Sequence, residues 1–329
     1  MGYGGYSYDK ATLLRSTATS DGYGSTFRRD EDVKAGRAVF AIHEDVDPTK
    51  IKNGIRESRD SDDHPNSCPI AVFLDVTGSM SNSPKKVMDE FPQLMATIIK
   101  DAGIEDPHLL FGAIGDAYCD RAPFQVSQFE ADNKTEEQIS HFLLEGGGGS
   151  NRHESYDLAM YFLARMTSCD AWEKRGEKGF AFIVQDEPPP PHLPKEHVKS
   201  VFGQTIQDDI SFAEIIKEAE EKWNIFILRL QTTSMGSDAN ITKQWKKFFG
   251  QNVIDLPNEK SICGLIATIL AQQTGADVDK VADTMGLSRK TLSDVKTIVI
   301  REEGAIVKGG KSAATGTIEI TKEEAAERL

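Results

Sequence analysis

An apolar run that ends in an aspartate constrains the fold of this chain more than any other feature. Residues 70–74 are all hydrophobic, which is typical of a strand buried on both faces inside a parallel sheet. Asp75 follows directly, and Thr77 and Ser79 come at alternate positions after it. One carboxylate and two hydroxyls on a short loop are hard oxygen donors of the kind that Mg²⁺ prefers. The segment therefore predicts one half of a magnesium site.

The chain downstream alternates between strand and helix patterns. This alternation predicts the α/β fold class, with a doubly wound, mostly parallel sheet flanked by helices. We expect a short antiparallel edge strand at 123–130. A run of four glycines at 146–149 ends in Ser150, ahead of a further predicted helix. The other strands are expected at 108–114, 179–184, 225–230 and 252–256, and the other helices at 87–99, 135–145, 210–222, 241–249 and 261–273.

Three polar positions fall where predicted strands or loops reach one edge of this sheet. They are Asp75, Ser150 after the glycine run, and Asp186 after the strand at 179–184. In an open parallel sheet, ligands bind at the carboxyl ends of the strands. We therefore expect these side chains to meet in space.

Taken together, these motifs resemble the von Willebrand factor A-type domain with its metal-ion-dependent adhesion site, in the form found inside cells. The resemblance covers roughly residues 67–273. The family usually has D-x-S-x-S, where this chain carries Thr77, and a threonine after its Gly-Gly, where this chain has Ser150. It usually has Thr-Asp-Gly in the third motif, where this chain has Gln185, Asp186 and Glu187.

The resemblance implies a metal site and a mode of action. Asp75, Thr77, Ser79, Ser150 and Asp186 would hold Mg²⁺, with Mn²⁺ or Ca²⁺ as alternatives. One coordination position would remain for an acidic side chain of a protein partner, with no bond broken. Intracellular relatives often act as adaptors or scaffolds in multiprotein complexes, including complexes with AAA+ ATPases, and that role is the expectation here.

Other acidic residues near these motifs have two interpretations each. Asn151 and Glu154 have the spacing of a helix N-cap and its N3 partner, which favours a capping box for Glu154 over metal binding. The alternative places Glu154 beside the metal ligands. Asp116 and Asp120 either support the metal site or accept hydrogen bonds within their own loop.

Two alternative functions remain open. The chain could be a structural assembly subunit that makes no use of metal. It could also be a phosphotransferase similar to haloacid dehalogenases, with Asp75 as nucleophile. That interpretation leaves the glycine run and Asp186 without a role, and only 41 residues separate Asp75 from the acidic motif at Asp116.

Composition narrows the classes of partner. The formal charge of −14 opposes nucleic-acid binding through phosphate contacts. There is no apolar run long enough to span a bilayer and no secretion-signal pattern at the start, so the expected location is the cytoplasm. The four cysteines are widely spaced, which opposes a disulfide framework or a structural zinc site.

The pattern divides the chain into four parts. Residues 1–66 are expected to form an extended Gly-, Tyr- and Ser-rich arm with a polar lead-in, including a short edge strand at 38–42. Residues 67–273 form the α/β domain, and residues 274–300 a helical hairpin around Gly286. Residues 301–329 are expected to be a flexible tail with one strand at 316–320.

Overall fold

The centre of the molecule is a six-stranded sheet with the order β10-β9-β6-β2-β3-β4. It is seen in a computed structural model, which describes residues 5–80, 82–147, 153–233 and 235–298. All neighbouring strands are parallel except β4, which pairs antiparallel with β3 at one edge. The predicted α/β class with a mostly parallel sheet is therefore confirmed. The strands are β2 (Cys68–Asp75), β3 (Pro107–Ile114), β4 (Phe124–Val126), β6 (Gly179–Gln185), β9 (Trp223–Leu230) and β10 (Val253–Leu256).

Strand β2 lies in the middle of the sheet and is buried on both faces. Ile70, Val72 and Leu74 belong to the hydrophobic core on one side of the sheet. Ala71 and Phe73 belong to the core on the other side. A continuous apolar run, rather than an alternating one, is what a strand covered by helices on both faces requires.

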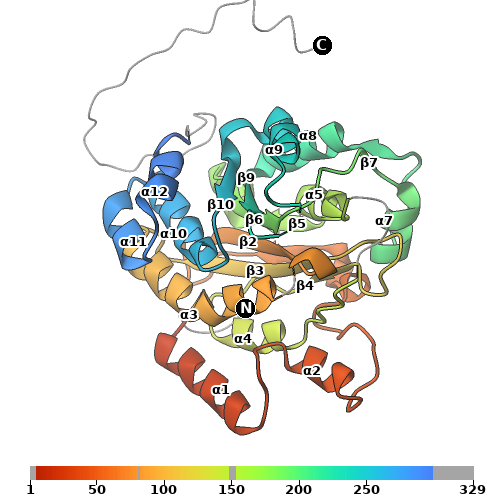
Figure 1. The fold of residues 1–329 in the computed structure, drawn as a ribbon, viewed down its shortest axis with the longest axis horizontal. Coiled ribbons are helices and arrows are strands. Elements are labelled where there is room, and N and C mark those ends of the chain that lie inside the picture. The colour runs from red at the N-terminus through yellow and green to blue at the C-terminus, as the bar shows by residue number, and fades with distance from the viewer. Residues whose placement is uncertain (1–4, 81, 148–152, 234, 299–329) are drawn as a thin grey trace, which may run out of the picture.

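Helices cover both faces of the sheet, as Figure 1 shows. One face carries α3 (Ser83–Asp101), α10 (Ser261–Thr274), α11 (Val278–Thr284) and α12 (Arg289–Lys296). The other face carries α5 (Tyr156–Arg165), α7 (Lys195–Phe202), α8 (Phe212–Lys222) and α9 (Ala239–Phe249). The two short helices expected on either side of Gly286 are α11 and α12. None of the helices among the described residues is long and apolar enough to cross a membrane.

The N-terminal segment is helical and docked, which corrects the prediction of an extended arm. Helix α1 (Tyr8–Ser20) buries only Ala11 fully, so apolar contacts contribute little to its position. Polar contacts to α3 and α4 hold it instead: Arg15 donates to the Met88 carbonyl, and its Nε lies 2.8 Å from Glu136 Oε2. The hydroxyl of Tyr6 donates to Glu136 Oε1 at 2.7 Å. The arm was mispredicted because its partner lies more than a hundred residues away.

Several other local predictions differ from the structure. The expected edge strand at 38–42 does not form, and this segment follows α2 (Arg28–Lys34) as irregular chain. Helix α4 (Lys134–Ser140) ends earlier than the predicted residue 145. Beyond its end, the side chain of Gln125 hydrogen-bonds the backbone N–H and carbonyl of Leu143 in place of helical partners. The predicted strand at 316–320 and the tail lie outside the described residues. The short elements missed by the sequence pattern include η1 (Pro48–Lys50), η2 (Lys52–Gly54), α6 (Asp170–Arg175), β7 (His192–Leu193), β8 (Ile210–Ser211) and η4 (Gly250–Asn252).

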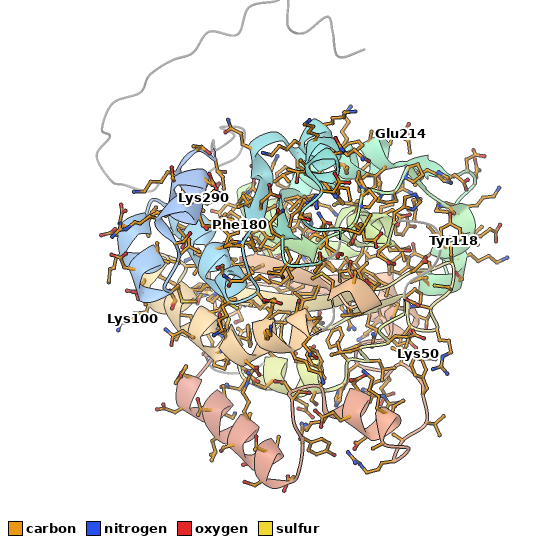
Figure 2. The ribbon with its side chains drawn as sticks, in the orientation of Figure 1. Lys50, Lys100, Tyr118, Phe180, Glu214 and Lys290 are labelled. Carbon is orange, nitrogen blue, oxygen red and sulfur yellow. The ribbon has the colours of Figure 1, made fainter. Side chains whose placement is uncertain are left out.

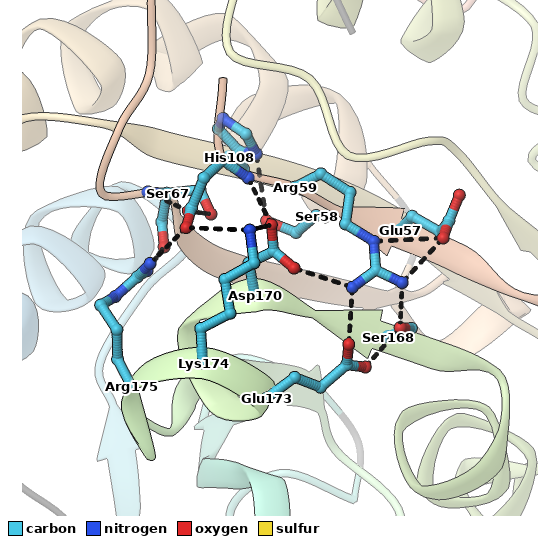
Figure 3. A network of polar contacts seen from close by, with 11 residues as sticks. Glu57, Ser58, Arg59, Ser67, His108, Ser168, Asp170, Glu173, Lys174 and Arg175 are labelled. Carbon is cyan, nitrogen blue, oxygen red and sulfur yellow. Dashed lines mark hydrogen bonds and ion pairs between the residues drawn. The ribbon is translucent and has the colours of Figure 1, made fainter. Parts of the chain in front are cut away.

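The lead-in before the sheet is also ordered, through a small second sheet and an ion-pair network. Strand β1 (Arg56–Ser58) pairs parallel with β5 (Thr167–Cys169). Arg59 then reaches Asp170 and Glu173, with nitrogen–oxygen distances of 2.9 and 2.6 Å (Figure 3). The segment predicted to be a polar loop is therefore fastened to the domain.

Candidate functional site

The candidate site begins at the carboxyl end of β2, where the chain leaves the middle of the sheet. Asp75 is fully buried. Its Oδ1 accepts hydrogen bonds from the backbone N–H of Thr77 at 2.9 Å and from the Thr77 hydroxyl at 2.5 Å. Aspartate commonly makes such bonds two residues ahead, and they force a tight turn. The short 3-10 helix η3 (Gly78–Met80) continues this turn.

Asp186, from the third predicted motif, is hydrogen-bonded to Ser79 in the first. The hydroxyl of Ser79 donates to Asp186 Oδ1 at 3.0 Å, and it lies 3.4 Å from the hydroxyl of Thr77. Four of the five predicted ligands, Asp75, Thr77, Ser79 and Asp186, are therefore within a continuous set of polar contacts. Their role as metal ligands stays a prediction.

The beginning of the glycine run packs against the same turn. The N–H of Gly78 donates to the carbonyl of Gly147 at 2.7 Å. A Cβ on Gly78 would lie 3.1 Å from the Gly146 carbonyl, and one on Gly147 would lie 1.9 Å from Asp120 Oδ1. A side chain at either position would therefore force its neighbours to shift. The fifth predicted ligand, Ser150, lies outside the described residues, as does Asn151.

Tyr156 completes the surroundings of Asp75 and was missed by the sequence pattern. Its hydroxyl donates to Asp75 Oδ2 at 2.6 Å, from the first turn of α5. Its ring meets Trp245 edge to face, with centroids 5.5 Å apart. Burial, followed by the charge of Asp186, raises the pKa of Asp75 to about 7. Hydrogen bonds thus hold both carboxylate oxygens of Asp75 in place, while its surroundings disfavour the ionised form.

Asp186 follows β6 and is also fully buried. No described residue donates a hydrogen bond of good geometry to its Oδ2. Burial raises its pKa, while the hydroxyls of Thr233 and Ser79 oppose the rise. An oxygen that is buried yet unsatisfied is costly unless a proton or a cation binds it.

A buried arginine and a tryptophan fix the loop that carries Asp186. Arg229 Nη2 donates to the backbone carbonyl of Asp186 at 3.2 Å and to that of Gly236 at 2.9 Å. Trp245 Nε1 donates to the carbonyl of Glu187 at 2.8 Å. These contacts hold the loop in position. Neither residue carries a motif that would reveal this role in the sequence.

Glu154 is not the N3 residue of a capping box on α5, which corrects that prediction. Helix α5 begins at Tyr156 with Ser155 as its N-cap, so Glu154 precedes the helix. Its side chain is buried, and its Oε2 has no hydrogen-bond partner among the described residues. Burial and then the charges of Asp75 and Asp116 raise its pKa to about 9. The alternative expectation, a position beside the metal ligands, stays a prediction.

Asp116 and Asp120 act within their own loop. Asp116 Oδ1 accepts the N–H of Tyr118 at 2.9 Å, and Asp120 Oδ2 accepts the N–H of Asp116 at 2.8 Å. The loop presents Tyr118 at the surface, where the side chain projects from the molecule with 62% of its area exposed (Figure 2). Its ring lies edge to face on His197, with centroids 4.4 Å apart. The charges of both aspartates still reach Glu154.

The donor chemistry of this cluster is all oxygen. Carboxylates and hydroxyls converge, and no imidazole or thiol belongs to the described set around Asp75 and Asp186. Such a set fits Mg²⁺, Ca²⁺ or Mn²⁺ and not the metals that favour nitrogen and sulfur. A divalent cation would also neutralise carboxylates that are otherwise driven towards protonation.

No family model matches the chain, and no curated protein matches it. Solved structures that resemble it include the pilus adhesin SpaC of Lactobacillus rhamnosus GG, with a TM-score of 0.43, 10% identity, and coverage of 69% of this chain and 32% of the adhesin. Proximal thread matrix protein 1 of the mussel byssus matches with a TM-score of 0.38, 9% identity, and coverage of 66% and 48%. A von Willebrand factor type A protein from Catenulispora acidiphila matches with a TM-score of 0.35, 13% identity, and coverage of 67% and 43%. The chain spans less than half the length of each of these structures, and TM-scores this low carry no conclusion about its function.

Proposed function

We propose that this chain is an A-type protein-interaction domain that binds Mg²⁺ through Asp75, Thr77, Ser79, Ser150 and Asp186 and, through the metal, an acidic side chain of a partner protein. One observation carries the proposal. The Ser79 hydroxyl is bonded to Asp186 Oδ1, while Oδ2 of the same buried carboxylate has no donor of good geometry among the described residues. A cation bound among these oxygens would satisfy that atom.

The electrostatics of the site support a cation. Asp75, Glu154 and Asp186 are all buried, and burial raises the pKa of each. The charges that act most strongly on Asp75 and Glu154 are those of other carboxylates. Buried like charges are tolerated when they coordinate a metal.

Ligand binding fits the geometry of Asp75 better than nucleophilic attack does. Its Oδ1 is engaged by Thr77 and its Oδ2 by Tyr156, and none of its surface is exposed. A phosphotransferase nucleophile must instead approach its substrate in line. Gly78 is exposed and Ser79 half-buried, so the outer side of the turn is open to an incoming carboxylate. An adaptor role in a cytoplasmic complex, with an AAA+ ATPase or another subunit as partner, remains a prediction from the resemblance.

Binding of paramagnetic Mn²⁺ to the full chain tests both the metal site and the binding of a carboxylate through the metal. We expect bound Mn²⁺ to be displaced by Mg²⁺, and Asp186→Asn to weaken its binding at least about tenfold. Asp279→Asn, at an exposed position on α11, is the matched control and should bind normally. The relaxation of solvent water by bound Mn²⁺ should fall when acetate or a glutamate-containing peptide is added, because a carboxylate replaces a metal-bound water. Normal metal binding by Asp186→Asn would refute the site, and relaxation unchanged by carboxylates would refute the binding mode.

A further inference from the structure

A second cluster of potential metal ligands lies between the chain that follows α2 and the C-terminal end of α4, outside the site described above. It consists of His43, Asp45 and His141, whose ligand atoms all lie within 4.8 Å of one another. Asp45 Oδ2 is 3.4 Å from His43 Nδ1 and 3.1 Å from His141 Nδ1. His43 and Asp45 come from the turn after α2, and His141 caps the C-terminus of α4.

The two distances from Asp45 are close to those between neighbouring ligand atoms of a tetrahedral metal ion. Zinc bonds to histidine nitrogen and carboxylate oxygen are about 2.0–2.2 Å long, which places neighbouring ligand atoms about 3.3 Å apart. An ordinary hydrogen bond between Asp45 and His141 would give a similar distance. However, the geometry for that bond is not met, and the buried Nδ1 of His141 has no hydrogen-bond partner among the described residues.

The backbone holds the ligand-bearing turn in a fixed place. The N–H of Val46 donates to the carbonyl of His43 at 3.0 Å, and the N–H of Val126 in β4 donates to the carbonyl of Val46 at 2.9 Å. Arg56 Nη2 donates to the carbonyl of Asp45 at 2.7 Å. The turn is therefore tied to the edge of the central sheet before any ion binds, which lowers the cost of assembling a site.

We propose that His43, Asp45 and His141 form a second metal site, selective for Zn²⁺ and similar transition-metal ions, that fastens the N-terminal segment to the end of α4. Two imidazoles and one carboxylate favour such ions over Mg²⁺. Asp45 is half exposed, so the fourth position is open to water or to a ligand from outside. This inference does not depend on the proposed function.

Binding requires one local change. The two imidazole rings are stacked, with centroids 3.7 Å apart and planes at 22°, so their lone pairs do not yet converge. The rings must turn apart about their Cβ–Cγ bonds, a torsion with a broad energy well. The long hydrogen bond from the N–H of Asp45 to His43 Nδ1, 3.3 Å, is given up in exchange. Burial and the neighbouring His43 lower the pKa of His141, which favours the neutral ring that a metal requires.

Titration of the full chain with Co²⁺ in excess Mg²⁺ tests the proposal, because the visible absorption of Co²⁺ reports its ligands. We expect one Co²⁺ per chain, displaced by Zn²⁺, with affinity at least about tenfold lower in His43→Ala and in His141→Ala. His192→Ala, a half-exposed histidine elsewhere, is the matched control and should bind Co²⁺ normally. Asp75→Asn should also bind Co²⁺ normally, since it disables only the oxygen site.

Three results would overturn the proposal. The first is a His43→Ala/His141→Ala double variant that binds Co²⁺ as the wild type does. The second is loss of Co²⁺ binding in Asp75→Asn. The third is loss in Cys119→Ser, which would assign the ion to the exposed thiol. A cooperative urea transition shows that each variant has folded.

Discussion

Replacing Asp75 by asparagine is expected to stabilise the metal-free protein while removing its response to Mg²⁺. Burial raises the pKa of Asp75 from its ordinary value of 3.8 to about 7. Each unit of pKa corresponds to about 1.4 kcal/mol, so holding Asp75 ionised in the folded state costs about 4 kcal/mol in the absence of a cation. Asparagine removes that cost and still accepts the hydrogen bonds from Thr77.

The sign of the pH dependence follows from the raised pKa. A carboxyl whose folded pKa exceeds its unfolded value contributes stability that is complete below the unfolded pKa and is lost as pH rises through the folded pKa. Between about pH 5 and about pH 8, Asp75 should therefore cost the metal-free protein roughly 2.5 kcal/mol of unfolding free energy. Glu154 changes in the same direction, because its pKa is raised to about 9.

Urea unfolding of the chelator-treated protein at both pH values measures this difference. The wild type should lose more stability than Asp75→Asn over the interval, by roughly 2.5 kcal/mol. Adding Mg²⁺ near pH 8 should stabilise the wild type and leave Asp75→Asn unchanged. Equal pH dependence in the two proteins, or a variant that Mg²⁺ stabilises as strongly as the wild type, would refute the electrostatic reasoning.

Three further substitutions test the supports of the site. Tyr156→Phe removes the donor to Asp75 Oδ2 and should weaken Mn²⁺ binding by about 10–100-fold, measured by titration. Gly147→Ala places a Cβ 1.9 Å from Asp120 Oδ1 and should lower the melting temperature and the Mn²⁺ affinity together, unlike the exposed control Gly5→Ala. Arg229→Met leaves buried loop carbonyls without their donor and should lower the free energy of unfolding by about 3 kcal/mol, measured by urea denaturation. An unchanged urea midpoint would contradict this expectation.

The sequence predicts the central sheet well because both faces of its strands are buried. An uninterrupted apolar run such as 70–74 has few other structural solutions, and helices with one apolar face must lie on such a sheet. The position of the N-terminal segment depends instead on contacts between residues that are far apart in the sequence. Helix α1 buries one residue, and the contact between Arg15 and Glu136 that positions it spans 121 residues. Local patterns contain no information about such a contact.

The residues of the candidate site also differ in whether the sequence could predict them. Asp75 and Asp186 were predictable because parallel strands end at a common edge. Tyr156 was not, because its reach to Asp75 depends on where α5 begins. The sequence pattern set that start at Asn151, whereas the structure sets it at Ser155, and this shift moves Glu154 from a capping role into the carboxylate cluster.

The two proposed metal sites should discriminate between ions by donor type alone. Around Asp75 every described donor is an oxygen, and the raised pKa values show that its negative charge is poorly compensated. Around Asp45 two of three donors are imidazole nitrogens. Excess Mg²⁺ should therefore saturate the first site and leave the second free, whereas Zn²⁺ at low concentration should enter the second first. If Asp75→Asn abolished the binding of both ions, the second site at Asp45 would be refuted.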